Sequence, residues 1–328
     1  MVKRLRDVGE HGFVAAIEGL GAGGSRRRDR GVSIGIGDDA ALVRCQGATL
    51  LTTDSMVEGT HFMRHWLTPA ELGRRALLAA VSDVSAMGGR PRYVLLSLSL
   101  PPSYRVRDGK SLVRSVVREA AAMGAFLVGG NLSRATKVSL TVTVVAEAGK
   151  RTVGRTGARA GQGIFVTGTL GSSRAGVVQL KKGIHNGSLV DAYRRPPLRL
   201  GVGRVLARSG LAKAMIDVSD GLLADLDRLC EASRVSALID TSSIPVSRLL
   251  RRTVSAPLGY VLAGGEEYEL LFTADQGKAE QVERKCALES CPVTHIGVVA
   301  KGVRGSGVRV RDHKNRPFKR RPRGYEHF

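Results

Sequence analysis

Apolar and polar positions along the chain alternate between the period of an amphipathic helix and that of a half-buried strand. Apolar side chains at helical spacing follow Thr68 and Pro69, a favourable helix start, and continue to Met87. Between Lys137 and Ala148 apolar residues recur at every second position, which predicts a strand with one buried face. Helices are expected at 68–87, 106–123, 173–182, 222–232 and 276–289, and strands at 49–53, 93–100, 126–128, 137–148, 164–167, 237–240, 269–273 and 294–298. Because the two kinds of element mix without strict alternation, the sequence predicts an α+β fold.

The length of the chain, 328 residues, favours two domains over one. Glycines gather among lysines and arginines between residues 149 and 163, a composition typical of a linker. We therefore expect an N-terminal domain over residues 1–150 and a C-terminal domain over residues 151–328.

The chain is strongly basic, with a formal net charge of +22, and aromatic residues make up only 4% of it. Such a charge attracts either nucleic acid or small anions such as nucleotides. No predicted helix carries a long Lys/Arg stripe with interleaved aromatic residues, which argues against a nucleic-acid partner. No apolar run reaches the ~18 residues of a membrane span, and the cysteines form no CxxC pair. We expect a cytoplasmic protein that does not contact membranes.

In this basic chain, aspartates gather in short acidic groups flanked by apolar or small residues. The groups are Gly37-Asp38-Asp39, Thr52-Thr53-Asp54 and Asp217-Val218-Ser219-Asp220-Gly221, with Asp83 inside an apolar helix. Neighbouring carboxylates repel one another and lose hydration when buried, so their clustering makes sense where cations are supplied. Hard divalent ions prefer oxygen ligands, and Mg²⁺ usually binds together with substrate phosphates. The acidic groups therefore predict a magnesium site.

Most of these residues also have a purely structural interpretation. Gly37-Asp38 is a favoured turn pair, Asp54 could mark the end of a strand, and Ser219 could cap a helix. A single histidine such as His61 is either a substrate contact or a structural residue. Glu266 belongs to Gly-Gly-Glu-Glu-Tyr-Glu, which could be a solvated turn ahead of a strand.

Several known phosphate-handling and hydrolytic motifs are absent from the sequence. It contains no GxxxxGK[ST], no protein-kinase loops, no HExxH and no nucleophile elbow. Phosphate chemistry would therefore depend on metal ions and backbone turns, through positioning and charge neutralisation. No covalent intermediate is expected.

The order and spacing of eight motifs point to a family. The motifs are GIGDDAAL, TTDSMVEGTHF, AVSDVSAMGGRP, LVGGNLSR, IFVTGTLG, IDVSDGL, GGEEYELLF and GYEHF. In this order the chain resembles the thiamine-monophosphate kinase family, which is related to aminoimidazole ribonucleotide synthetase and selenophosphate synthetase. The resemblance extends over nearly the whole chain.

The resemblance implies a two-domain α+β fold of the aminoimidazole ribonucleotide synthetase type. Its N-terminal domain would pair with a second copy in a barrel-like interface, giving a homodimer, and its C-terminal domain would be α/β. It also implies transfer of the γ-phosphoryl group of ATP to thiamine monophosphate, which yields thiamine diphosphate and ADP. ATP would be the co-substrate and several Mg²⁺ ions the cofactors.

The resemblance further implies roles for individual residues. The metal ligands of the family fall on Asp38, Thr52, Thr53, Asp54, Asp83, Asp217 and Asp220. Its nucleotide contacts fall on Gly130, Asn131, Arg155 and Ser219. Its contacts to thiamine monophosphate fall on His61, Glu266 and Tyr325.

The chain departs from the family at Asn131, where Gly-Gly-Asp is usual. Asparagine keeps an oxygen ligand but removes one negative charge, so we expect weaker binding of one metal ion or an altered number of ions. Two alternatives stay open: another ATP-dependent synthetase of the superfamily, and a catalytically impaired relative that binds nucleotide or RNA. Against the first, no cysteine precedes Asp38 and the chain ends in His327-Phe328 rather than in cysteine.

Overall fold

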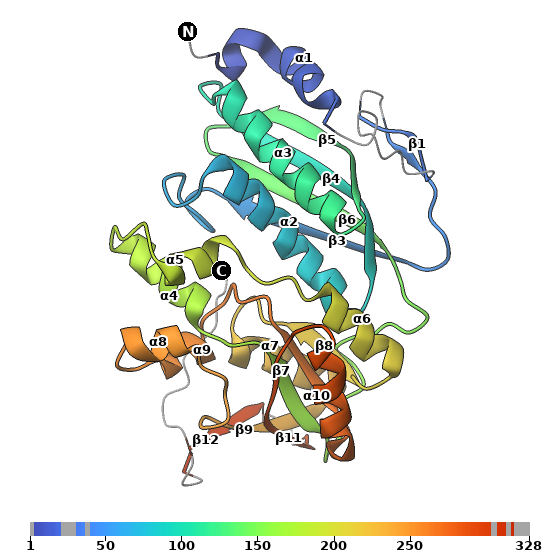
Figure 1. Cartoon of the computed structure of the whole chain (residues 1–328), viewed down its shortest axis with the longest axis vertical. Coiled ribbons are helices and arrows are strands. Elements are labelled where there is room, and N and C mark those ends of the chain that lie inside the picture. The colour runs from blue at the N-terminus through green and yellow to red at the C-terminus, as the bar shows by residue number, and fades with distance from the viewer. Residues whose placement is uncertain (1–2, 21–30, 37–39, 303–306, 313–315, 318–328) are drawn as a thin grey trace. The chain divides into compact units, whose positions relative to one another are not determined.

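The computed structural model describes residues 3–20, 31–36, 40–302, 307–312 and 316–317. The chain divides into two compact units (Figure 1). Unit 1 comprises Met1–Val84 and Arg90–Ala148, and unit 2 comprises Ser85–Gly89 and Gly149–Phe328. Two predicted site residues, Asp38 and Tyr325, lie outside the described residues.

Unit 1 is built on a four-stranded sheet with the strand order β3-β6-β4-β5. The strands are β3 (Thr49–Val57), β4 (Arg90–Leu100), β5 (Phe126–Arg134) and β6 (Ser139–Glu147). Strand β6 pairs antiparallel with β3 and β4, whereas β4 and β5 are parallel. Along β6, the fully buried Leu140, Val142 and Val144 alternate with half-buried residues, so the predicted period of two is confirmed.

Helices α2 (Pro69–Ala86) and α3 (Val106–Ala122) lie on one face of this sheet (Figure 1). Both agree with the helices predicted from apolar spacing. Helix α1 (Leu5–Glu18) packs on α3, where a Cβ at Gly109 would lie 2.6 Å from the ring of Phe13. The opposite face of the sheet is covered in part by the hairpin of β1 (Val32–Ile34) and β2 (Leu42–Val43).

Strands β3 and β5 of unit 1 extend well beyond their predicted ranges, and β4 begins three residues earlier than predicted. Strand β3 continues through Val57 because Ser55 and Met56 still pair with β6, so Asp54 lies inside the strand and not at its end. Strand β5 continues to Arg134, since its glycines pair with β4 although they carry no apolar signal.

Unit 2 is built on a six-stranded sheet with the order β12-β9-β11-β7-β10-β8. The strands are β7 (Gly163–Thr167), β8 (Ala214–Asp217), β9 (Val235–Asp240), β10 (Leu270–Ala274), β11 (Val293–Lys301) and β12 (Val308–Arg311). All neighbours are antiparallel except β12 and β9. The side chains of β7 alternate between two cores, with Ile164 and Val166 in one and Phe165 in the other.

Helices cover both faces of this second sheet. One core packs beneath α7 (Leu222–Ser233), α4 (Ser172–Lys181), α5 (Ser188–Arg194), α8 (Arg248–Thr253) and α9 (Leu258–Leu262). The other packs beneath α6 (Leu200–Ser209) and α10 (Ala279–Ala287), the latter preceded by a 3-10 turn, η1 (Gln276–Lys278). Helices α5, α6, α8 and α9 were not predicted. Among the described residues, no helix is long and apolar enough to cross a bilayer.

Candidate active site

In unit 1 the structure brings together Thr52 and Asp83. The Thr52 hydroxyl donates a hydrogen bond of 2.5 Å to Oδ2 of Asp83, which joins β3 to α2. Thr52 and Asp54 share one face of β3 because side chains two residues apart point the same way. Asp54 itself accepts a 2.7 Å bond from the Ser55 backbone N–H. A hydroxyl and two carboxylates therefore collect on the helix side of the sheet.

Thr53 and Asn131 lie on the opposite face of the same sheet. The Thr53 hydroxyl is 3.1 Å from that of Thr143, and Asn131 is exposed and pairs with Ser97. Strands β3 and β5 are the two edges of the sheet, so about 14 Å separates them at the usual spacing of ~4.8 Å per strand. Within one chain, Asn131 is therefore not brought to Asp54, the carboxylate of β3.

Gly130 and Asn131 line a large cleft of unit 1. Its volume is about 950 Å³, within the range that holds a small ligand. Side chains of α1, the loop around Ile36, and strands β4, β5 and β6 form its mostly apolar walls. Gly130 packs so closely that a Cβ there would overlap the carbonyl oxygen of Leu96.

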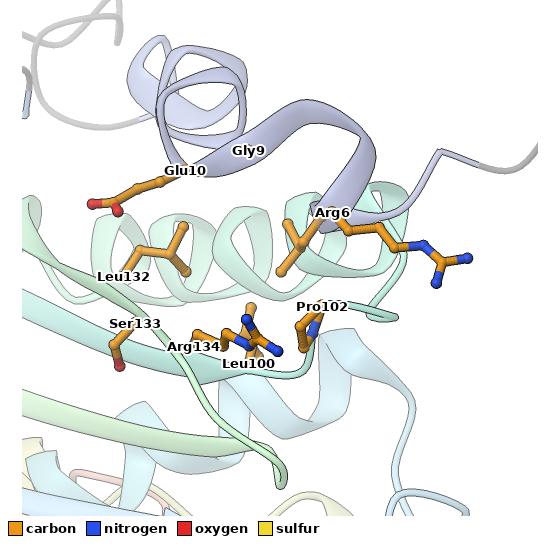
Figure 2. Close-up of a pocket in the computed structure, with 9 residues that line it drawn as sticks. Arg6, Gly9, Glu10, Leu100, Pro102, Leu132, Ser133 and Arg134 are labelled. Atoms are coloured by element: carbon orange, nitrogen blue, oxygen red, sulfur yellow. The ribbon is translucent and has the colours of Figure 1, made fainter.

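A smaller pocket of about 270 Å³ lies beside this cleft, between α1 and the ends of β4 and β5 (Figure 2). Leu100, Pro102 and Leu132 supply apolar walls, and the Arg6 side chain points away from the pocket. Glu10 and Leu132 line both cavities, so the two adjoin. None of the predicted site residues lines the smaller pocket, whereas Gly130 and Asn131 line the larger cleft.

His61 lies in the turn that follows β3. Its Nδ1 accepts a 2.9 Å hydrogen bond from the Val57 backbone N–H, so in the neutral ring the proton is on Nε2. Nearby, burial raises the pKa of Glu58, but the Val138 N–H and the Arg64 guanidinium hold it below its usual value. The histidine thus has a structural bond on one nitrogen and Nε2–H as its second polar group.

In unit 2, two acidic loops meet at the end of β8. The Glu266 N–H donates to the Ser219 carbonyl at 2.7 Å, and the Tyr268 N–H donates to the Val218 carbonyl at 2.9 Å. The buried Asp217 ends β8, opposite Leu270. The predicted residues Asp217, Ser219, Asp220 and Glu266 therefore share one site.

The loop that contains Ser219 and Asp220 is held by a residue that sequence analysis missed. Oδ2 of Asp225, which is fully buried, accepts the backbone N–H groups of Ser219, Asp220 and Gly221 at 3.0, 3.0 and 3.1 Å. Burial raises the pKa of Asp225 to about 6, while these N–H groups and Arg228 act against the rise. Gly221 is the N-cap of α7 and no side chain caps it, so the interpretation of Ser219 as a cap is wrong.

A signal for Asp225 exists in the sequence. Leu222, Asp225, Leu226 and Leu229 share the apolar face of α7, and a carboxylate on such a face requires partners. The partners are backbone groups of the preceding loop, which a residue pattern does not specify.

The loop of Glu266 is not a solvated turn. Glu267 and Glu269 are only 4% and 3% exposed, and Glu266 and Tyr268 have positive φ angles of 70° and 53°. Burial raises the pKa of Glu267 to about 8, against the lowering effect of backbone N–H groups at the start of α4. These contacts fix a backbone that is strained at two positions.

Glu269 anchors the end of the same loop. Both of its carboxylate oxygens bond Arg199, at 2.6 Å each, and Oε2 also accepts the Thr167 hydroxyl at 2.6 Å. This bidentate pair is almost completely withdrawn from water on the glutamate side. The residue pattern does not reveal Arg199 as a partner of Glu269, because the two are 70 residues apart along the chain.

Arg155 lies apart from the acidic loops of unit 2. Its carbonyl accepts a 2.7 Å bond from the Ser233 hydroxyl at the C-terminal end of α7, while Asp220 precedes the N-terminal end. A helix of this length spans about 18 Å. The Arg155 side chain is exposed.

The donor atoms fit Mg²⁺ in kind. Carboxylate and hydroxyl oxygens are the ligands that this ion takes, commonly one or two carboxylates together with phosphate and water. Unit 1 offers Thr52, Asp54 and Asp83, and unit 2 offers Asp217 and Asp220. Among the described residues, no three His, Cys, Asp or Glu side chains form a group able to hold a metal ion by themselves. Substrate phosphates would complete such a site.

The two units match the two domains of AIR synthase related proteins. Residues 37–148 match the N-terminal domain and residues 159–309 the C-terminal domain of that class. Thiamine-monophosphate kinase of Bacillus subtilis is 33% identical over 308 residues, which cover 90% of this chain and 94% of the relative. The enzyme of Aquifex aeolicus is 35% identical over 99% of this chain and 100% of the relative. The chain belongs to the thiamine-monophosphate kinase family.

Solved structures agree with this assignment. Thiamine-monophosphate kinase from Stenotrophomonas maltophilia matches with a TM-score of 0.80 and 30% identity, over 90% of this chain and 94% of that one. AaThiL complexed with AMPPCP and TMP matches with a TM-score of 0.76 and 33% identity, over the full length of both. The hydrogenase maturation protein HypE, at 20% identity and a TM-score of 0.78, shares the fold. The predicted two-domain α+β fold is confirmed.

Proposed function

We propose that this protein transfers the γ-phosphoryl group of ATP to thiamine monophosphate, forming thiamine diphosphate and ADP. The observation that supports this most directly is the full-length match, at 33% identity, to AaThiL complexed with AMPPCP and TMP. AMPPCP is an ATP analogue with a non-hydrolysable bond, so that relative binds a nucleotide and the acceptor together.

The reaction is a direct transfer between phosphates. A phosphate oxygen of thiamine monophosphate attacks the γ-phosphorus, and the bond to the β-phosphate oxygen breaks to release ADP. The acceptor is already an anion, so no strong base is required and catalysis consists of positioning and charge stabilisation. Mg²⁺, when bound, supplies the positive charge that neutralises the phosphates.

The chain's own residues divide this task. Gly130 and Asn131, which line the large cleft, would contact ATP. Thr52, Thr53, Asp54 and Asp83 of unit 1, with Asp38, and Asp217 and Asp220 of unit 2 would hold the ions. Ser219 and Arg155 would contact ATP, and His61, Glu266 and Tyr325 would orient thiamine monophosphate.

We further propose that the active form is a homodimer. The face of the unit 1 sheet that carries Thr53 also carries Leu51 and Leu95, which are 72% and 36% exposed. Exposed leucines on a sheet face favour an apolar partner surface. A second copy could also bring its own β5 close to β3 of the first copy. The cytoplasmic location stays a prediction.

An end-point assay tests the activity. The protein is incubated with ATP, Mg²⁺ and thiamine monophosphate, and thiamine diphosphate is measured by chromatography. Free thiamine and an aminoimidazole precursor serve as alternative acceptors. Product from another acceptor alone would reassign the enzyme within the superfamily, and no product from any acceptor would favour the binding-only alternative. Asp83→Asn is expected to abolish product, whereas Asp108→Asn, an acidic residue of α3, is expected to keep it.

Asn131 has its own test. Restoring the usual acid with Asn131→Asp is expected to lower the Mg²⁺ concentration needed for half-maximal activity, because one more carboxylate neutralises the ion. Identical Mg²⁺ titrations of the two proteins would refute this role.

A further inference from the structure

Arg228 of α7 is held between two carboxylates of different character. Its Nη1 lies 2.5 Å from Oδ2 of Asp220 and 2.6 Å from Oδ1 of Asp225. The Asp225 side chain is fully buried, whereas that of Asp220 is 28% exposed and that of Arg228 is 40% exposed. One guanidinium therefore links a buried structural acid to an acid that can reach solvent.

The two carboxylates differ in what else holds them. Asp225 also accepts the three backbone N–H groups of the loop, so it cannot leave its position without breaking them. Among the described residues, Arg228 is the side chain that donates a hydrogen bond to Asp220. Asp220 can therefore exchange its partner, while Asp225 remains in place.

We propose that Arg228 is a resident counter-ion that a divalent cation must displace from Asp220, and that Arg228 thereby sets the metal affinity of the loop of residues 217–221. The inference rests on the proposed function, which assigns Asp220 as a metal ligand. It adds a residue that the sequence motifs do not contain.

The geometry explains why the exchange is possible. When Asp220 turns to a metal ion, Arg228 still has Asp225 at 2.6 Å, so no unpaired cation is left behind. Before the ion arrives, Arg228 neutralises Asp220 and limits repulsion between Asp220 and the neighbouring Asp217. The loop can therefore keep its conformation without metal.

The size of the effect follows from exposure. Both members of the Asp220–Arg228 pair are partly solvated, and such pairs contribute at most about 1 kcal/mol, which corresponds to roughly a five-fold change in an equilibrium constant. Removing the guanidinium should therefore tighten metal binding by up to about five-fold.

Mn²⁺ binding to the protein in the presence of AMPPCP, a non-hydrolysable ATP analogue, provides a test that does not depend on turnover. AMPPCP without protein gives the baseline. Free Mn²⁺ is measured by electron paramagnetic resonance during titration of the wild type, Arg228→Gln and Arg228→Met, each checked for folding by circular dichroism. Arg284→Gln, on the exposed face of α10, removes the same charge elsewhere in unit 2 and is the matched control. Arg228→Lys keeps the charge and should restore affinity close to that of the wild type.

We expect both neutral variants at position 228 to bind Mn²⁺ more tightly than the wild type and Arg284→Gln, by up to about five-fold. In the Asp220→Asn background, Arg228→Gln should have no further effect, because the exchanging carboxylate is gone. Equal affinities for Arg228→Gln, Arg228→Met and Arg284→Gln would overturn the proposal, and so would a tightening that persists without Asp220. Failure of the wild type to form thiamine diphosphate would overturn the proposed function and leave this result standing.

Discussion

Glu267 should make the stability of unit 2 fall as pH rises toward neutrality. Its side chain is 4% exposed, and burial raises its pKa from 4.5 to about 8. Backbone N–H groups of Arg174, Ser173 and Gly171 favour the charged form but do not offset the loss of hydration. The folded chain therefore keeps a proton on Glu267 at pH values where the unfolded chain has lost it.

The sign and size of the effect follow from this difference. Below pH 4.5 both states are protonated and the stabilisation is fully present. Between pH 4.5 and about 8 the folded state holds one proton more, so the free energy of unfolding falls by about 1.4 kcal/mol per pH unit. Over two pH units in this window, Glu267 alone should cost about 3 kcal/mol.

Glu267→Gln removes the titrating group and keeps a carbonyl oxygen that can accept the same N–H groups. The free energy of unfolding of this variant, minus that of the wild type, should therefore rise by about 3 kcal/mol from about pH 5 to about pH 7. Urea unfolding should be followed by far-UV circular dichroism, because the one tryptophan, Trp66, reports on unit 1 alone.

Glu280→Gln, on the exposed surface of α10, is the matched control. A difference between Glu267→Gln and the wild type that stays constant with pH would refute the reasoning. The same pH-dependent difference in Glu280→Gln would refute it as well.

Three further substitutions test the contacts that hold the site. Arg199→Leu should destabilise unit 2 by about 3 kcal/mol, because it leaves Glu269 buried without its charge partner, and adding Glu269→Leu should recover most of the loss in urea unfolding. Gly221→Ala should lower stability by about 1–3 kcal/mol and lower the melting temperature, since φ is 124° and the new Cβ would lie 2.9 Å from the carbonyl carbon of Ala263. Thr52→Val should raise the Mg²⁺ concentration for half-maximal activity by removing the 2.5 Å bond to Asp83, whereas Thr52→Ser should not. An unchanged melting temperature of Gly221→Ala would contradict the first of these last two predictions. An unchanged Mg²⁺ titration of Thr52→Val would contradict the second.

Sequence alone predicted the elements whose apolar period is long and regular. Helix α2 and strand β6 are examples, because the spacing of their apolar residues shows directly which face is buried. The glycine-rich end of β5 and the short helices α5 and α6 were missed, since pairing with β4 and packing against distant elements define them instead. The order of the motifs supplied the family.

The sequence predicted the residue types of the candidate site but not the residues that hold its loops in place. The acids of the IDVSDGL and GGEEYELLF motifs could be named from the sequence, and they do meet in unit 2. The residues that hold these loops, Asp225 and Arg199, could not be predicted. Asp225 bonds backbone N–H groups, and Arg199 pairs with Glu269, which is far from it along the chain. A turn rich in glutamate was open to interpretation as solvated until the burial of Glu267 and Glu269 was known.

Apart from the buried Asp217, the acidic residues that form or hold the two loops of unit 2 fall into two classes that perform different tasks. Asp225, Glu267 and Glu269 are buried and saturated with backbone or arginine donors, so a metal ion could take them only by breaking several bonds. Asp220 and Glu266 are half-buried on the loops that the first class holds, and each has few bonds to exchange. Under the proposed function the chain needs both classes: the first would fix loops with strained backbone, and the second would change partners when ligands bind. Exchange of Asp225 for a side chain that cannot accept its three backbone N–H groups should therefore loosen the loop of residues 217–221, whereas exchange of Asp220 should change ligand affinity with the loops intact.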